Sequence, residues 1–509
     1  MAKRKQLTDD STMEDVLWKA AVKLRGGVEY PVYKNIVLPL VFLKFISDKF
    51  NKQRQKLIED PETRDFIEFK EFYNQDSVCY LEPECRWEYI LASAKADDIR
   101  LVLDRAMEKI ESDNEELLKG TLPKNYYAGV EIEDAKLSSL IDVINKLNTT
   151  KDEEEDIIGR VYEYFLGMFS SKEGKGEFYT PKPIVKLIAE MIQPLHGHIF
   201  DPCCGSGGMF VQSMKIVEAH NGHRNDVALI GQEYSPTTLR LAKMNMAIRG
   251  ISADFGSGPG SSLIADQHKD LRADFVMANP PFNQDDWGLD QVINDPRWVY
   301  GTPPNSNANY AWIQHFLYHL NENGVAGFVL ANGALTTMQN GEEEIRKNMV
   351  EKSIIDCIIS MPDKLFYKVT IPVSLWFCSK SKKRRTNGTK NRILFIRCNE
   401  LGRMTDRTHK TIDDDEILRI ADTYHKWVND DGYEDILGFC KSATISQIRE
   451  KGYKLNPGLY TGYIPKNEDD LPFEEKMNRY TEELRNLLKE SHSVEDELRR
   501  VFKSIGYEI

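Results

Sequence analysis

Residues Phe200–Phe210 read FDPCCGSGGMF, and this stretch decides the class of fold. A short strand ends in the acid Asp201, a glycine-rich turn follows, and a helix then begins. Glycines let the backbone approach a ligand closely, and the first turn of a helix presents free N–H groups to an anion. The stretch has neither the Gly-Lys-Ser/Thr of a P-loop nor the GxGxxG of a dinucleotide site. It therefore predicts an α/β fold with a ligand near this turn, although a plain strand–helix turn is the structural alternative.

Strand-like and helix-like segments alternate around this stretch, from Ile184 to about Lys380. Such alternation predicts a doubly wound α/β sheet. We expect strands at 199–200, 227–231, 275–278, 325–331, 354–360, 373–378 and 393–397. The last two resemble an antiparallel hairpin. Between them, Ser379–Arg392 holds seven Lys/Arg and no acidic residue, so it is either a contact for nucleic-acid phosphates or a solvated tip.

The flanking regions read as helical. Residues 1–150 show helical patterns at Met13–Val22, Ile36–Phe50, Ile99–Ile110 and Leu137–Leu147, and no catalytic constellation, which favours a docking or assembly domain. We expect a catalytic domain over 151–400, its extension over 401–470 and a tail over 471–509. That tail contains a final helix, Pro472–Phe502, with an apolar face that needs a partner.

Composition excludes several classes of protein. The 509 residues hold 67 Lys+Arg against 80 Asp+Glu, a net charge of −13, whereas a chain that holds DNA alone usually shows a basic excess. No apolar run approaches the roughly 20 residues of a membrane helix, and no signal core follows the N-terminus. Eight scattered cysteines predict reduced thiols and no metal site. We expect a cytoplasmic protein that does not bind membranes.

Two further acidic or amide positions follow expected strands. Glu233 lies at the end of the strand 227–231, where a carboxylate can accept both hydroxyls of a ribose, or else interact with a helix dipole. Asn279-Pro280-Pro281-Phe282 ends the strand 275–278. Because the prolines stiffen the turn and remove two donors, the Asn279 side-chain oxygen and the Pro280 carbonyl remain as acceptors beside a ring. This arrangement suits a planar exocyclic amine whose base stacks on Phe282.

Taken in order, these motifs resemble the adenine-N6 DNA methyltransferases, and more narrowly the methylation subunit of type I restriction–modification systems. The set also includes Glu177-Phe178-Tyr179-Thr180-Pro181, before a helix. The resemblance extends over about residues 150–460, and its later motifs are Gly324–Gly333, Met361–Phe366, Ile371–Ser374, Leu394–Ile396 and Leu455–Pro457. The family often has two small residues where this chain has Cys203 and Cys204. Pro202-Cys203 also resembles the nucleophile of cytosine-C5 enzymes, but it lies in the cofactor loop.

The resemblance implies a Rossmann-like methyltransferase sheet, S-adenosylmethionine as methyl donor and transfer to adenine N6 in duplex DNA. Asn279, Pro280, Pro281 and Phe282 would hold the extruded adenine, and Glu233 the cofactor's ribose. Asp266 would lie near the cofactor's adenine ring. The remaining cofactor-binding positions would be Glu177, Phe178, Tyr179, Thr180, Pro181, Lys182, Asp201, Gly205, Ser206, Gly207 and Gly208. No metal is implied.

The resemblance also implies partners: double-stranded DNA, a specificity subunit that reads the sequence, and a second copy of this chain. Recognition by a separate subunit would account for the acidic composition. The sequence leaves open whether a restriction subunit joins, and which DNA sequence is recognised. Two alternatives stand beside this prediction: a glutamine-N5 protein methyltransferase, whose fourth motif residue is usually Tyr, and an inactive methyltransferase fold that serves only in assembly.

Overall fold

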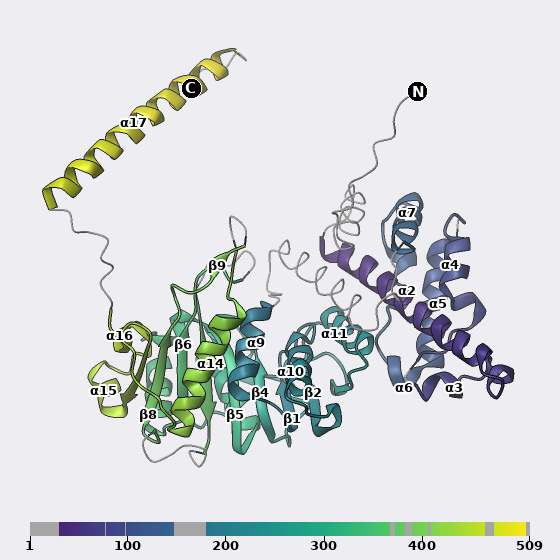
Figure 1. The fold of residues 1–509 in the computed structure, drawn as a ribbon, viewed down its shortest axis with the longest axis horizontal. Coiled ribbons are helices and arrows are strands. Elements are labelled where there is room, and N and C mark those ends of the chain that lie inside the picture. Colours follow the sequence, from purple (N-terminus) through teal and green to yellow (C-terminus); the bar gives the residue numbers. More distant parts are fainter. Residues whose placement is uncertain are drawn as a thin grey trace. The chain divides into compact units, whose positions relative to one another are not determined.

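The computed structural model describes residues 30–76, 78–96, 98–146, 180–366, 372–381, 389–405, 409–463 and 473–504 (Figure 1). The chain divides into two compact units, Met1–Thr461 and Gly462–Ile509. The predicted helix Met13–Val22 lies outside the described residues. The predicted domain boundaries near residues 150 and 470 also fall in undescribed segments, so they stay predictions.

Helices around one apolar core form the amino-terminal part of the larger unit. α2 (Tyr30–Glu59) contains the predicted run Ile36–Phe50, whose apolar side chains from Ile36 to Leu43 are fully buried. Buried Asp104 accepts the backbone N–H groups of residues 126–128, which explains a carboxylate in this core. Two more predicted helices are confirmed, with shorter helices between them: α3 (Glu71–Asn74), α4 (Trp87–Ser93), α5 (Ile99–Asp113), α6 (Glu115–Leu118) and α7 (Asp134–Ile144).

A mixed sheet forms the centre of the catalytic region and confirms the predicted α/β class. The nine strands found in the described residues run in the order β11-β8-β6-β7-β5-β4-β1-β2-β3. β4, β1, β2 and β3 are parallel neighbours, so their carboxyl ends meet at one edge. The bounds are β1 (Gly197–Asp201), β2 (Val227–Gly231), β3 (Ala253–Asp254), β4 (Ala273–Ala278), β5 (Leu320–Ala331), β6 (Ile355–Ser360), β7 (Val373–Ser379), β8 (Arg392–Arg397) and β11 (Cys440–Thr444). A small pair, β9 (Arg403–Met404) and β10 (Lys410–Thr411), lies apart from it.

The hairpin predicted for 373–378 and 393–397 is wrong. β7 pairs antiparallel with β5 and β6, whereas β8 pairs parallel with β6 and antiparallel with β11. β6 therefore separates the two strands. All six of its residues are buried, so it needs a neighbour on each edge, and the connection 380–391 exceeds the roughly two to five residues of a hairpin loop.

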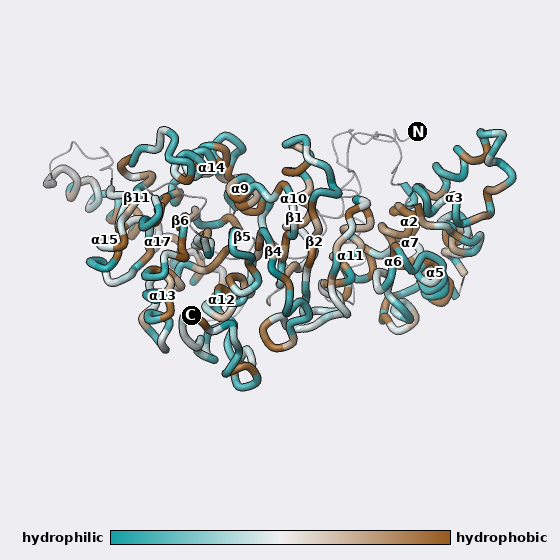
Figure 2. The backbone as a smooth tube through the Cα atoms, turned by 90° about the horizontal axis from the view of Figure 1, so that it is seen from below, coloured by the Kyte–Doolittle hydropathy of each residue, from teal (hydrophilic) through white to brown (hydrophobic). Residues whose placement is uncertain are grey.

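Helices cover both faces of the sheet, and each face has its own apolar core. Figure 2 shows α9, α10 and α14 on one side and α12 and α13 on the other. α11 (Pro236–Ile248) packs on both the sheet and the helical domain: it contributes Leu239, Ala242 and Met246 to one core of the sheet. Its Leu241, Met244 and Ile248 belong to the core of the helical domain. The other bounds are α9 (Lys182–Ile192), α10 (Gly208–Ala219), α12 (Asn309–His319), α13 (Glu342–Glu351), α14 (Asp414–Asn429), α15 (Ile445–Glu450) and α16 (Gly458–Thr461).

The smaller unit contains one long helix, α17 (Phe473–Ser504), which confirms the helix predicted over 472–502. Its large apolar side chains are exposed by about half, among them Leu484, Leu488 and Leu498. No helix in the described part of the chain combines the length and the apolarity that crossing a membrane requires.

Candidate active site

The glycine-rich turn after β1 is held by backbone geometry that only glycine adopts easily. Gly205 has φ +54° and Gly207, which caps α10, has φ +79°. Buried Asp201 accepts the Cys203 N–H at 3.1 Å, and burial raises the pKa of Asp201 to about 7. A Cβ at Gly205 would meet no atom within 4 Å, so the turn leaves open space beside it.

Glu233 connects this turn to the next strand. Its carboxylate accepts the Gly205 N–H at 3.0 Å and the Ser235 N–H at 2.8 Å. The carboxyl ends of β1 and β2 are thus joined through one side chain. Both hydrogen bonds come from rigid backbone, so the carboxylate has a defined position in the wall of the cavity described below.

The segment Asn279–Phe282, called here the catalytic turn, follows β4 directly. The Asn279 Nδ2 donates to Thr180 Oγ1 at 2.9 Å, which brings two of the predicted motifs into contact. The Asn279 Oδ1 is buried and has no hydrogen-bond partner among the described residues. A buried acceptor without a donor is costly, so its position indicates a ligand donor.

Only some of the remaining predicted site residues can be located near the catalytic turn. Phe282 is half-buried and contacts Phe366 edge to face, with ring centroids 6.0 Å apart, and it does not line the cavity. Pro181 caps α9 and Lys182 is its first residue. The predicted residues Glu177, Phe178 and Tyr179 lie outside the described residues.

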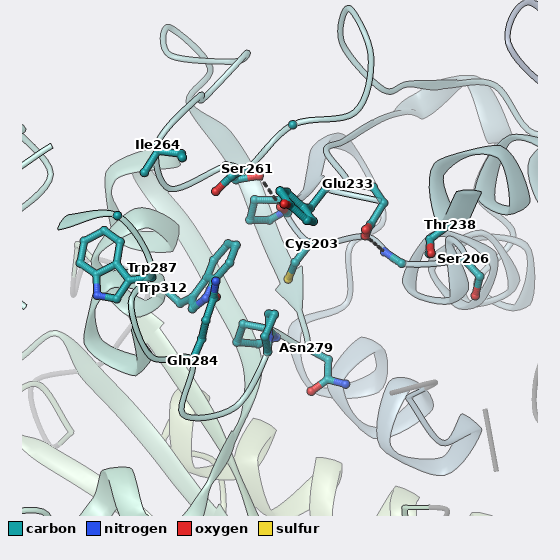
Figure 3. Close-up of a pocket in the computed structure, with 18 of the residues that line it drawn as sticks. Cys203, Ser206, Glu233, Thr238, Ser261, Ile264, Asn279, Gln284, Trp287 and Trp312 are labelled. Carbon is teal, nitrogen blue, oxygen red and sulfur yellow. Dashed lines mark hydrogen bonds between the residues drawn. The ribbon is translucent and has the colours of Figure 1, made fainter. Parts of the chain in front are cut away.

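A cavity of about 380 Å³ lies along these turns (Figure 3). Of the predicted residues, it is lined by Gly205, Ser206, Glu233, Asn279, Pro280 and Pro281. Its opposite side, called here the far wall, consists of Ser261, Ile264, Gln284, Trp287 and Trp312. The far wall holds two more buried polar atoms without a partner in the described structure, Gln284 Oε1 and Trp312 Nε1.

Sequence reasoning missed the far wall and one residue of the helical domain. Lys34, on α2, is 6% exposed and lines the cavity, although its domain shows no catalytic pattern. Gln284 and Trp287 closely follow the catalytic turn, and that proximity was the available signal. Lys34 and Trp312 come from distant helices, and nothing in their local sequence points to the site.

Cys203 lines the cavity without being suited to nucleophilic attack. Burial raises the pKa of its thiol well above the ordinary value, and the nearby Asp201 and Glu233 carboxylates raise it further. Since the thiolate is the reactive form, this cysteine remains a protonated wall residue.

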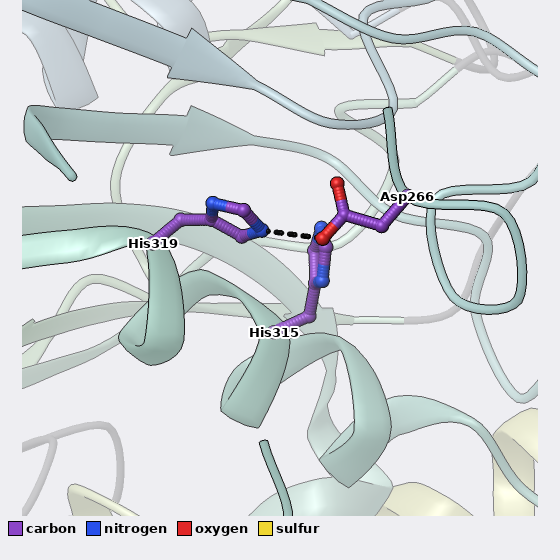
Figure 4. A group of neighbouring side chains, drawn as sticks. All are labelled: Asp266, His315 and His319. Atoms are coloured by element: carbon purple, nitrogen blue, oxygen red, sulfur yellow. Dashed lines mark hydrogen bonds and ion pairs between the residues drawn. The ribbon is translucent and has the colours of Figure 1, made fainter. Parts of the chain in front are cut away.

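Asp266 is not brought to the cavity; it faces two histidines of α12 instead (Figure 4). Its carboxylate lies 2.9 Å from His319 Nε2 and accepts the His268 N–H at 2.9 Å. Burial alone would raise the pKa of Asp266, but the His319 hydrogen bond and the nearby His315 lower it below the ordinary range. Its predicted contact with an adenine ring stays a prediction.

Asp266, His315 and His319 lie close enough to hold a cation, but the surrounding donors disfavour one. The Arg297 Nη1 lies 2.9 Å from His315 Nδ1, and since arginine only donates, this nitrogen accepts and the proton stays on Nε2. The His315 Nε2 therefore presents an N–H rather than a lone pair. Arg297 also donates to the carbonyls of Ser262 and Leu263, so the cluster braces the far wall from behind.

Comparison with known proteins identifies the family. The N-6 DNA methylase profile matches residues 153–469, which is more than half of the chain. The chain belongs to this family. The profile of the HsdM N-terminal domain matches residues 13–147, the helical part.

Two similar relatives are methylase subunits of type I restriction enzymes. The HindI subunit of Haemophilus influenzae is 42% identical over 425 residues, covering 81% of this chain and 94% of the relative. The MjaIX subunit of Methanocaldococcus jannaschii is 38% identical over 518 residues, covering 97% of this chain and 91% of the relative. The fold agrees with that of the methyltransferase subunit of a type I restriction–modification system from Streptococcus thermophilus, with a TM-score of 0.74 and 24% identity. The match covers 88% of this chain and 99% of that subunit.

This N-6 DNA methylase is therefore an adenine-specific DNA methyltransferase, the modification subunit of a type I restriction–modification system. The predicted fold, family and enzyme class are confirmed. The comparisons do not favour the glutamine-N5 protein methyltransferase or the inactive assembly subunit.

Proposed function

We propose that the catalytic turn binds an adenine extruded from duplex DNA, with S-adenosylmethionine in the adjoining cavity. The unpartnered Asn279 Oδ1 carries this proposal, because it is an acceptor held ready for an amine hydrogen. The Pro280 carbonyl is the second acceptor, and a base in a duplex must leave the stack to reach such a site. Thr180 accepts from Asn279 Nδ2 and thereby fixes which amide atom faces the base.

The cavity suits the cofactor. Its volume of about 380 Å³ falls within the range of small-molecule sites, roughly 300–1,000 Å³. The open space beside Gly205, the fixed Glu233 carboxylate and the unpartnered atoms of the far wall supply room, acceptors and a donor for a nucleoside. When bound, S-adenosylmethionine supplies an electrophilic methyl group. Ser206, Gly207 and Gly208 are its proposed partners in the glycine-rich turn.

The chain's own residues then orient the adenine and accept hydrogen bonds from its amine. Asn279 Oδ1 and the Pro280 carbonyl accept the two amine hydrogens, which raises the nucleophilicity of N6 and holds it in line for transfer. Phe282 is proposed to stack on the base from the rim of the site. Since no protein atom is alkylated, the buried Cys203 thiol has no part in the reaction.

The partners proposed are DNA, a specificity subunit and a second copy of this chain, one for each strand. The net charge of −13 supports a partner that supplies much of the phosphate contact. The exposed apolar side chains of α17 support that helix as the contact with the specificity subunit. Of the basic loop Ser379–Arg392, residues 382–388 lie outside the described structure, so both interpretations of it, a phosphate contact and a solvated tip, stay open.

The experiment compares the purified chain with the chain co-expressed with its adjacent specificity gene, and maps N6-methyladenine in a plasmid. We expect weak, unspecific DNA binding by the single chain, and methylation of one defined sequence by the complex. A chain ending at Tyr463 should lose assembly while still binding S-adenosylhomocysteine. Efficient methylation of a defined sequence by the single chain would overturn the partner proposal, whereas normal assembly of the truncated chain would overturn only the role of α17.

A further inference from the structure

Trp312 differs from the other tryptophans of the described structure. Six tryptophans are described, and in five of them the indole Nε1 donates a hydrogen bond: Trp87, Trp287, Trp298, Trp376 and Trp427. The Trp312 side chain is equally buried, at 5% exposed, but its Nε1 has no partner among the described residues. A buried indole N–H usually finds an acceptor, and because Trp312 lines the cavity, a ligand bound there can supply one.

Gln284 provides the complementary atom on the same wall. Its Oε1 is buried and lacks a donor in the described structure, and both side chains line the same cavity. In Figure 3 they lie on the side of Trp287, opposite Ser206 and Thr238. The far wall thus offers one acceptor and one donor, with indole rings beside them.

Backbone hydrogen bonds hold these two residues in a fixed relation. The backbone carbonyl of Gln284 accepts the backbone N–H of Ala308 at 2.9 Å. The backbone carbonyl of Ala308 in turn accepts the backbone N–H of Trp312, one helical turn later, at 2.9 Å. Asn283 and Asn309 exchange two more hydrogen bonds, of 3.0 and 2.9 Å. The loop after the catalytic turn is therefore fastened to the start of α12, which fixes the backbone positions from which both side chains project.

The polarity of the Trp312 indole selects a 6-aminopurine. Adenine presents an amine donor at position 6 and acceptor nitrogens in the ring, which match Gln284 Oε1 and Trp312 Nε1–H. A 6-oxopurine presents an acceptor at position 6 and a donor at N1; the Gln284 amide can turn to meet the first, but the indole N–H can only donate and would oppose the second. Aromatic neighbours suit the flat ring.

Resting on the proposed function, the structure assigns Gln284 and Trp312 as the residues that recognise the adenine ring of S-adenosylmethionine. The cofactor's adenine is favoured over the extruded base, because Figure 3 shows Asn279 projecting away from Gln284 and Trp312. Glu233 lies between Trp312 and Ser206 along the cavity in that view, where a ribose would connect the base to the methionine end. Recognition of the ring thus falls to these two residues and not to Asp266.

The test measures binding by calorimetry on the full chain, with S-adenosylhomocysteine and its 6-oxo analogue S-inosylhomocysteine as probes. The wild type should prefer S-adenosylhomocysteine by about tenfold, since the donor–acceptor pair at the Trp312 indole N–H is reversed in the 6-oxo probe. Gln284→Leu and Trp312→Phe should each weaken S-adenosylhomocysteine about tenfold, and Trp312→Phe should also abolish that preference. Trp427→Phe is the matched control, because it removes an indole N–H outside the cavity, and it should leave both affinities unchanged.

The outcomes separate the possible sources of the ring. Unchanged affinities in both variants, with cooperative unfolding intact, would overturn the assignment. Unchanged S-adenosylhomocysteine affinity together with altered 2-aminopurine fluorescence at the target position would overturn it in favour of the extruded base. A wild type that binds neither probe would instead contradict the proposed cofactor. Should Gln284→Leu fail to fold, the near-isosteric Gln284→Met also removes the amide and should weaken S-adenosylhomocysteine by the same factor.

Discussion

The two sides of the cavity are built in different ways. On the side of the catalytic turn, the proposed reacting groups come from short segments at the ends of neighbouring strands, fixed by backbone hydrogen bonds such as Gly205 N–H to Glu233. On the far wall, side chains come from two loops and from α12, and a buried network centred on Arg297 and Asp266 holds the first of these loops. The proposed chemistry thus depends on local sequence, while the proposed recognition of the ligand depends on tertiary packing.

The largest expected effect lies in the catalytic turn. Asn279→Ala should lower methyl transfer by at least about 1,000-fold, because it removes a preorganised acceptor of the reacting amine. The affinity for S-adenosylhomocysteine should stay within about twofold, since the side chain is proposed to contact the base and not the cofactor. Radiolabel transfer and calorimetry on the same preparation measure both. Near-normal turnover would end the adenine-site proposal.

The next effect lies behind the far wall and concerns stability. Asp266→Asn should lower the free energy of unfolding at pH 7 by about 3 kcal/mol, as is usual when one partner of a buried pair is removed. The folded pKa of Asp266 is lowered, so its contribution is present above the ordinary carboxyl range and is lost as the pH falls through the folded value. Urea denaturation at several pH values tests this.

Asp414→Asn is the matched control for that measurement. Asp414 pairs with Lys186, but its side chain is 73% exposed, and we expect a loss below about 1 kcal/mol. Equal losses in the free energy of unfolding for Asp266→Asn and Asp414→Asn would contradict a stabilising role of the buried cluster behind the far wall.

Phe282→Ala should come third, with methyl transfer reduced about 100-fold at unchanged cofactor affinity, because stacking of a base on a ring contributes roughly 1–3 kcal/mol. The Phe282 ring also packs on Phe366, so the free energy of unfolding is measured alongside. Phe282→Tyr preserves a ring and should keep most activity. Full activity in the alanine variant would mean that the ring stays against Phe366 during the reaction.

Glu233→Ala should weaken S-adenosylhomocysteine about 30-fold, since a carboxylate that accepts ribose hydroxyls makes charge-assisted hydrogen bonds. It also releases two backbone N–H groups, so Glu233→Gln, which keeps an oxygen in place, should lose less. An unchanged dissociation constant in the alanine variant would show that the ribose lies elsewhere.

The smallest effect is expected at the contact between two motifs. Thr180→Val removes the acceptor of Asn279 Nδ2 while keeping the side-chain shape, and should lower methyl transfer about tenfold. Thr423→Val, at a half-buried position of α14 whose hydroxyl bonds only to its own helix, is the control and should be neutral. If both variants were fully active, the orientation of the Asn279 amide would not depend on Thr180.

The sequence predicted the α/β class, the strand-end motifs and the terminal helix because periodicity and turn chemistry are local properties. It could not predict that β6 lies between β7 and β8, since strand order depends on which edges need covering. Nor could it predict that Asp266 pairs with His319, which is 53 residues away, or that Trp312 reaches the cavity. Those positions depend on long-range packing, which no short motif encodes.

The contact of α11 with the helical domain has a thermodynamic consequence. α11 begins just after Glu233, its Thr238 and Leu241 line the cavity, and its opposite face lies in the core of the helical domain, whose Lys34 also lines the cavity. A ligand that contacts both Lys34 and Glu233 is bound by two domains at once. By linkage, such a ligand at a hundred times its dissociation constant would hold the domains together by about 2.7 kcal/mol more than in the free protein. Ligand binding in the cavity and packing of the helical domain on the catalytic region are therefore linked: each makes the other more favourable.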